Sequence, residues 1–278
     1  MVKRRKMVTG IISKIEQDIG VQLFYRKNYP LTLTYAGEKY VDTARTILRL
    51  NDNLRRELVD IGLGKKGRII FGLPTERAGY MLPRVIPLYK KMFPQVEVQI
   101  YEAMSDDLLS ALLKDEINFY IIPRDLKDLP SGLQTECIYR ENLYLIAAPG
   151  VVKEEDLADP IHNIVRDAFL RSQPFIPIKK GHAIRKKTDE IFRKKKISPM
   201  VSMEVSSCIS AVQLAHSGLG ITIVPSRALE ALGGIDCFCR YQYGEIPDAW
   251  DVNVVYKKDS YLDRTERGFI ELLKSVFP

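Results

Sequence analysis

The chain has 278 residues, of which 46% are hydrophobic and 28% are charged, and its formal net charge is +7. This mix is typical of globular proteins and excludes collagen-like, low-complexity and disordered chains, while the length suggests two or three folded units. No apolar stretch of about 18 residues occurs, so we expect no transmembrane helix. The short apolar run after the basic start is too short for a signal peptide, so we expect a cytoplasmic protein.

The positive charge is concentrated at the beginning of the sequence. The first 66 residues hold 14 Lys or Arg and 7 Asp or Glu. Subtracting these from the totals of 42 and 35 leaves 28 residues of each sign, so the rest of the chain is neutral. This asymmetry predicts a polyanionic partner for the first segment alone. The alternative is a basic segment that only aids solubility.

The first elements indicate a helix followed by a hairpin. Apolar residues at i, i+3 and i+7 predict a helix over 9–19, with Gly20 as its stop. Two short apolar runs within 21–33 flank an Asn/Pro turn, which predicts a β-hairpin. The apolar stripe of the helix is Ile12, Ile15 and Ile19.

Thr34 can N-cap a long helix from about 35 to 61. Its apolar positions alternate in steps of four and three over three heptads, which predicts a dimerising coiled coil. Asn51 falls at an a-type position, where a polar residue can fix the register. The alternative is a helix packed in the core of its own domain. The predicted seam is Tyr40, Ala44, Ile47, Asn51, Leu54, Leu58 and Ile61.

Three glycines within 62–67 predict a hinge, and strand and helix candidates alternate after it. This order favours α/β units with parallel sheets. Helices are predicted at 81–92 and 106–114. Strands are predicted at 68–73, 96–101, 119–122, 143–147, 175–178, 220–224 and 252–256.

The sequence offers little support for catalysis. The three histidines share no metal-binding spacing, and we find no nucleophile elbow, P-loop or dinucleotide-binding motif. The four cysteines are too few for a disulfide scaffold, and Cys237 and Cys239 favour a strand with buried thiols over a zinc or redox pair. We therefore expect no enzyme activity, no cofactor and no metal. A small α/β enzyme such as a transferase is kept as a rival hypothesis.

Six segments, in order along nearly the whole chain, resemble LysR-type transcriptional regulators. Each motif is weak alone, but their shared order makes the resemblance specific. The first segment is similar to the end of the recognition helix and the first strand of the wing in that family. The segments are 15–26, 33–38, 67–72, 81–83, 93–98 and 218–225.

The resemblance implies an α/β fold with a partial winged helix-turn-helix, a long linker helix and a two-lobed effector domain similar to periplasmic binding proteins. The family normally has about two more helices before the recognition helix, so we expect a start that was assigned too late or a shortened gene. The implied limits are 1–34 for the DNA-binding part, 35–63 for the linker helix, 67–146 with 247–278 for lobe 1, and 147–246 for lobe 2.

The implied function is regulation of transcription by a small molecule, with an anionic metabolite among the expected effectors. The implied partners are double-stranded promoter DNA, the effector, RNA polymerase, and further copies in a homodimer or homotetramer. Effector binding between the lobes would shift the placement of the DNA-binding parts. The rivals are a solute-binding protein and a sensor that dimerises without binding DNA.

The resemblance also implies the residues of two sites. Thr75 and Ser105 match positions that line the effector cleft, where hydroxyl and helix N–H groups suit a carboxylate. By position alone, His182, Arg185, Ser206 and Ser207 are further ligand-binding candidates, although each can equally be a helix cap or a surface residue. For DNA, a solvated basic face is the alternative. The implied base-contacting residues are Arg5, Lys6, Thr9, Gly10 and Ser13, and the implied phosphate-contacting residues are Arg26 and Lys27.

Overall fold

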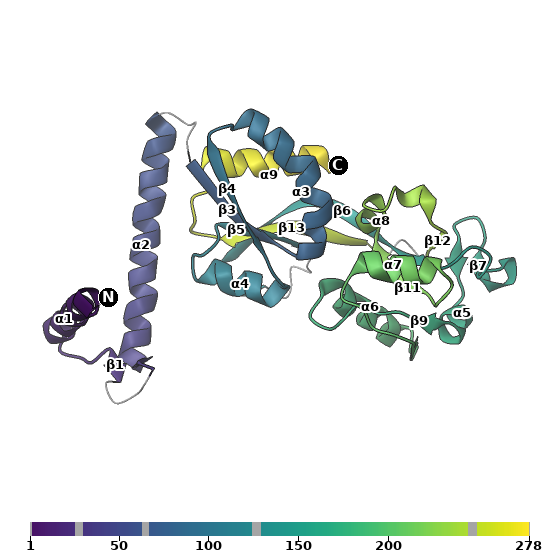
Figure 1. The fold of residues 1–278 in the computed structure, drawn as a ribbon, viewed down its shortest axis with the longest axis horizontal. Helices are drawn as coiled ribbons and strands as arrows, with labels where there is room; N and C mark the ends of the chain where they lie inside the picture. Colours follow the sequence, from purple (N-terminus) through teal and green to yellow (C-terminus); the bar gives the residue numbers. More distant parts are fainter. Residues whose placement is uncertain (1, 26–29, 63–66, 124–128, 244–248, 278) are drawn as a thin grey trace. The chain divides into compact units, whose positions relative to one another are not determined.

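The computed structural model of the chain describes residues 2–25, 30–62, 67–123, 129–243 and 249–277 (Figure 1). The chain divides into two compact units, Met1–Leu58 and Val59–Pro278. We call them the first unit and, after the effector domain that the resemblance implies, the effector unit. None of the helices that the structure describes is long and apolar enough to cross a membrane.

The first unit contains two helices and a short hairpin. The first helix starts seven residues earlier than predicted, because Lys and Arg are good helix formers and do not need the apolar stripe to extend it. Gly20 has a φ of 73°, which confirms the predicted helix stop. The antiparallel pairing of Phe24 with Leu33 confirms the hairpin. The elements are α1 (Val2–Ile19), β1 (Phe24–Tyr25), β2 (Thr32–Leu33) and α2 (Tyr35–Gly62), the last of which continues beyond the unit.

Buried polar contacts hold these elements together. The Glu16 carboxylate accepts hydrogen bonds from the backbone N–H groups of Leu23 at 2.8 Å and Phe24 at 3.2 Å. Thr34 confirms its predicted capping role, since its Oγ1 accepts the backbone N–H of Gly37 at 3.0 Å. A Cβ atom added to Gly37 would lie 2.0 Å from the carbonyl oxygen of Leu23. The start of α2 and the hairpin therefore pack at a distance that only glycine permits.

The effector unit is built on a mixed sheet with the strand order β11-β6-β13-β5-β3-β4, and β12 also pairs with β6. The parallel pairings of β3 with β4 and β5 agree with the prediction. The other pairings within this sheet are antiparallel, so the prediction is wrong for them, because short apolar runs indicate strands but not their direction. The strands are β3 (Gly67–Leu73), β4 (Val96–Glu102), β5 (Phe119–Pro123), β6 (Leu133–Ile146), β11 (Thr222–Pro225), β12 (Arg240–Tyr241) and β13 (Ala249–Lys257).

Lobe 1 consists of the β3, β4 and β5 region with three helices. Helices α3 (Thr75–Met92) and α9 (Arg264–Val276) cover one face of the sheet, and α4 (Ser105–Leu113) covers the other (Figure 1). In the core between the sheet and helices α3 and α9, the ring centroids of Phe71 and Phe269 lie 4.5 Å apart. Helix α3 starts six residues earlier than predicted, directly after Pro74, and turns residues such as Ala78, Met81 and Val85 into the core at helical spacing.

Lobe 2 has a separate core around the far end of β6. Strand β6 serves both lobes, since Tyr139 belongs to the core of lobe 1 and Leu143 to that of lobe 2. The strand is 14 residues long, whereas only 143–147 was predicted, because the polar residues 140–142 interrupt its apolar pattern. The other elements are β7 (Leu157–Asp159), β8 (Ile164–Val165), α5 (Asp167–Ser172), β9 (Pro174–Phe175), α6 (Ala183–Lys194), β10 (Met200–Val201), α7 (Cys208–His216) and α8 (Ser226–Glu230), with 3₁₀ turns at Glu154–Asp156 and Ile235–Cys237.

Candidate functional site

A cavity of about 670 Å³ lies between the two lobes of the effector unit. Lobe 1 contributes the start of α4 and the end of β5, where Ser105 and Pro123 line it. Lobe 2 contributes residues between Lys180 and Glu190, in the loop before α6 and in its first two turns. Arg140 of β6 and Trp250 of β13, the strands that run between the lobes, complete the wall. Ligands of open α/β sheets bind at such an edge, beyond the carboxyl ends of parallel strands.

The wall of this cavity carries charges of both signs. Within the described parts of the chain, no carboxylate forms an ion pair with Arg140, Lys180 or Lys187. Asp106 and Asp251 also line the cavity. The arrangement suits a small polar molecule that presents an anionic group to the basic side chains and a hydrogen-bond donor to the acidic ones.

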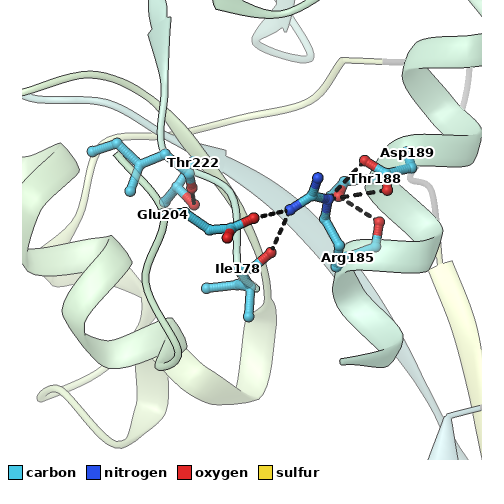
Figure 2. Close-up of polar contacts among 7 residues, drawn as sticks. Ile178, Arg185, Thr188, Asp189, Glu204 and Thr222 are labelled. Carbon is cyan, nitrogen blue, oxygen red and sulfur yellow. Dashed lines mark hydrogen bonds and ion pairs between the residues drawn. The ribbon is translucent and has the colours of Figure 1, made fainter. Parts of the chain in front are cut away.

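Arg185 lines the cavity but is bound to acceptors of the protein itself (Figure 2). Its Nε donates to both carboxylate oxygens of Asp189, at 2.9 and 3.0 Å. Its Nη1 donates to the Ile178 carbonyl at 3.1 Å and to the Glu204 carboxylate. Arg185 thus joins the start of α6 to the neighbouring loops, and a ligand would have to compete with these contacts.

The six predicted ligand residues fall into two groups. Ser105, His182 and Arg185 come together around the cavity. Thr75, Ser206 and Ser207 are not among the residues that line it. Thr75 is the exposed first residue of α3, Ser206 is exposed, and Ser207 caps α7 by accepting the N–H of Ile209 at 3.2 Å.

The second group flanks a contact between the lobes that the sequence did not indicate. The backbone N–H of Cys208, at the start of α7, donates to the Glu76 carboxylate of α3 at 2.6 Å. Burial, followed by the charge of Glu76, raises the pKa of the Cys208 thiol well above its usual value. The thiol is therefore held in its unreactive, protonated form.

A buried charged cluster adjoins this contact. Arg77 of α3 donates to the Glu141 carboxylate of β6 at 3.1 Å and to the Tyr139 hydroxyl. Burial alone would lower the pKa of Arg77, but Tyr139, Tyr80 and Glu141 together raise it above its ordinary value. Burial raises the pKa of Tyr139 to about 12, against the opposing effect of Arg77. The cluster therefore holds one charged pair among neutral phenols.

The remaining cysteines correct one prediction. Cys237 ends a 3₁₀ turn and is exposed, so the predicted strand with buried thiols at 237–239 is wrong. The alternating pattern was misleading because Gly233 and Gly234, both with positive φ, turn the chain just before it. Within the parts of the chain that the structure describes, no group of three or more His, Cys, Asp or Glu could hold a metal ion.

The first unit presents the predicted DNA-contacting helix and an apolar surface. Arg5, Lys6 and Thr9 lie in α1, where the structure describes the backbone but not their side chains, Gly10 is exposed and Ser13 is half-buried. Arg26 and Lys27 lie outside the described residues. Along α2 the predicted seam is open to solvent in the single chain, since Ile47, Leu54 and Leu58 are 61%, 54% and 58% exposed.

Comparisons with known proteins agree with this architecture. Residues 62–278 match the family model of the LysR substrate binding domain. The chain is 25% identical over 282 residues to the HTH-type transcriptional regulator YcgK of Bacillus subtilis (strain 168), covering 96% of this chain and 86% of that one. The structure resembles a full-length OxyR mutant from Pseudomonas aeruginosa, with a TM-score of 0.71, 20% identity, and coverage of 98% and 84%. It also resembles CbnR, a LysR family transcriptional regulator, with a TM-score of 0.57, 18% identity, and coverage of 98% and 89%.

Proposed function

This chain belongs to the LysR family of transcriptional regulators, and from that membership we propose that it binds promoter DNA under the control of a small anionic effector. The observation that carries the proposal is the cavity between the lobes, which is lined by Ser105, His182 and basic side chains such as Lys180, in a chain whose first segment holds the whole net positive charge. We place its action in the cytoplasm, in contact with RNA polymerase. Regulation rather than catalysis is the proposed role, because the relatives are regulators.

The exposed seam of α2 supports assembly of the regulator from more than one copy. Large apolar side chains at heptad spacing form a stripe along one helix, and a second helix that packs on this stripe removes it from water, which stabilises the pair. We propose a homodimer formed through Ile47, Leu54 and Leu58, which can assemble further to a tetramer. A dimer would present two copies of α1 to paired half-sites in the DNA.

Binding of this chain to the DNA upstream of its own reading frame should weaken steeply with salt. Each phosphate contact that releases counterions lowers the affinity about 3.5-fold when salt rises fourfold. Fluorescence anisotropy at about 50 to 200 mM salt measures the slope, and an unrelated duplex of equal length is the control. If neither duplex binds at the lowest salt, the chain is a sensor that does not bind DNA, and the proposal fails.

The cavity should prefer anions, and Lys180 and Arg140 should contribute to that preference. We expect carboxylates or sugar phosphates, and not neutral or cationic analogues, to raise the thermal midpoint of the full chain. A hydrogen bond to a charged group contributes about 1.5 to 3 kcal/mol, so Lys180→Ala and Arg140→Ala should each weaken the best ligand about tenfold or more. Lys258→Ala is the matched control, because this exposed lysine does not line the cavity. The anion preference would be refuted if a neutral or cationic ligand bound and both substitutions left its affinity unchanged.

A further inference from the structure

Glu141 occupies the point where β6 leaves lobe 1 and enters lobe 2, and its side chain is fully buried. Its carboxylate accepts three hydrogen bonds from three different elements. One oxygen accepts from Arg77 Nη2 at 3.1 Å and Trp250 Nε1 at 3.0 Å. The other accepts from the backbone N–H of Arg227 at 3.1 Å. The carboxylate is thus shared between α3 of lobe 1, α8 of lobe 2 and β13.

One of these partners, Trp250, belongs to the cavity between the lobes. Trp250 lines the cavity and packs against the cores of both lobes. Arg140, the neighbour of Glu141 in β6, also lines the cavity. Glu141 itself is not among the lining residues, and the hydrogen bond from Trp250 connects its carboxylate to the wall of the cavity.

A further set of contacts connects the same helices of the two lobes. Arg84 of α3 pairs with Glu230 of α8, and Arg227 pairs with the same carboxylate at 2.9 Å. Beside them, Glu76 of α3 accepts the N–H of Cys208 at the start of α7. Polar contacts therefore connect α3 to α7 and α8, and such contacts depend on orientation more strongly than apolar packing does.

We propose that Glu141 is the positioning residue that transmits occupancy of the cavity to the relative placement of the two lobes. A ligand that moves the Trp250 indole changes the hydrogen bond at the oxygen that Arg77 also uses. Because charged hydrogen bonds in a buried network strengthen or weaken one another, the change reaches α3 and α8 together. This inference rests on the proposed function, in which the cavity holds the effector.

Hydrogen exchange of the full chain tests the connection without any ligand. Trp250→Phe keeps an aromatic wall but removes the indole donor to Glu141. We expect amide exchange to speed up about fivefold or more in α8 (Ser226–Glu230) and at the start of α3, because the opening equilibrium of a segment follows the loss of a hydrogen bond. Strand β4 and helix α4 should be unchanged. Glu97→Gln, in an exposed pair with Arg68, is the control. If the amide exchange rate in α8 is the same in Trp250→Phe and in the wild type, the proposal is overturned.

A second arm uses inorganic phosphate as the probe and Glu141→Gln as the variant. Glutamine keeps the shape but offers one acceptor oxygen to three donors. In the wild type, phosphate should slow exchange at residues 180–190 and change it in α8. In Glu141→Gln, phosphate should still act at 180–190 with an affinity within about threefold, while the effect on α8 is lost. An α8 response that survives in the variant overturns the proposal. If phosphate has no effect in the wild type, the proposed anion site is contradicted. The role of Glu141 is then tested by the exchange of α8 in Trp250→Phe.

Discussion

Gly37→Ala should abolish DNA binding while the effector unit stays folded. The added methyl group would meet the Leu23 carbonyl oxygen at 2.0 Å, and backbone on both sides cannot rotate away as a flexible side chain can. Overpacking costs about 1 to 3 kcal/mol where the surroundings relax, and we expect the upper end or more here. A small unit with a few kcal/mol of stability would then lose its hairpin.

Anisotropy with promoter DNA and hydrogen exchange of the two units measure this outcome. Gly79→Ala, in α3 of the effector unit, is the control for the change from glycine to alanine, because a Cβ atom there meets nothing within 4 Å and alanine in a helix favours folding by about 0.5 to 1 kcal/mol. If Gly37→Ala binds DNA with wild-type affinity, the close contact between α2 and the hairpin is not required in solution.

Arg77→Met should destabilise the effector unit by about 3 to 5 kcal/mol, because it leaves the Glu141 carboxylate buried without a counter-charge. Replacing both partners removes the unpaired charge, so Arg77→Met with Glu141→Met should lose less than Arg77→Met alone. Chemical denaturation of the full chain measures the wild type and both variants.

The matched control for this pair is Arg68→Met. Arg68 and Glu97 form an ion pair of similar geometry, but their side chains are 55% and 53% exposed. Solvent screens exposed pairs and both side chains lose freedom on pairing, so this variant should be almost as stable as the wild type. Equal losses for Arg77→Met and Arg68→Met would contradict the argument from burial.

Local features of the fold were predictable from the sequence. Gly20 as a helix stop, Thr34 as a helix cap and the long helix α2 each depend on residues within a few positions of one another. Ser105, which the resemblance to a family implied, lines one cavity together with His182 and Arg185, which were candidates by position alone. The ion pair between Arg185 and Asp189 could also have been predicted from the sequence, since the two residues are four positions apart on one helix.

The contacts between the lobes could not be predicted in this way. Glu141 and Arg77 are separated by 64 positions, and nothing in the sequence around either residue indicates that it is buried. The length of β6 was missed for a related reason. Its residues 140–142 are polar because they pass between two cores, where they meet charged partners and the cavity instead of apolar side chains.

The position of β13 in the sheet has a consequence for synthesis of the chain. This strand, Ala249–Lys257, pairs with both β5 and β6 but is made after almost all the rest. While the chain leaves the ribosome, lobe 2 has all of its described strands once residue 241 is out, whereas lobe 1 still lacks its central one. We therefore expect the later-made lobe to fold first. A nascent chain that is stopped before Ala249 would expose the edges of β5 and β6, which makes it a natural client for chaperones.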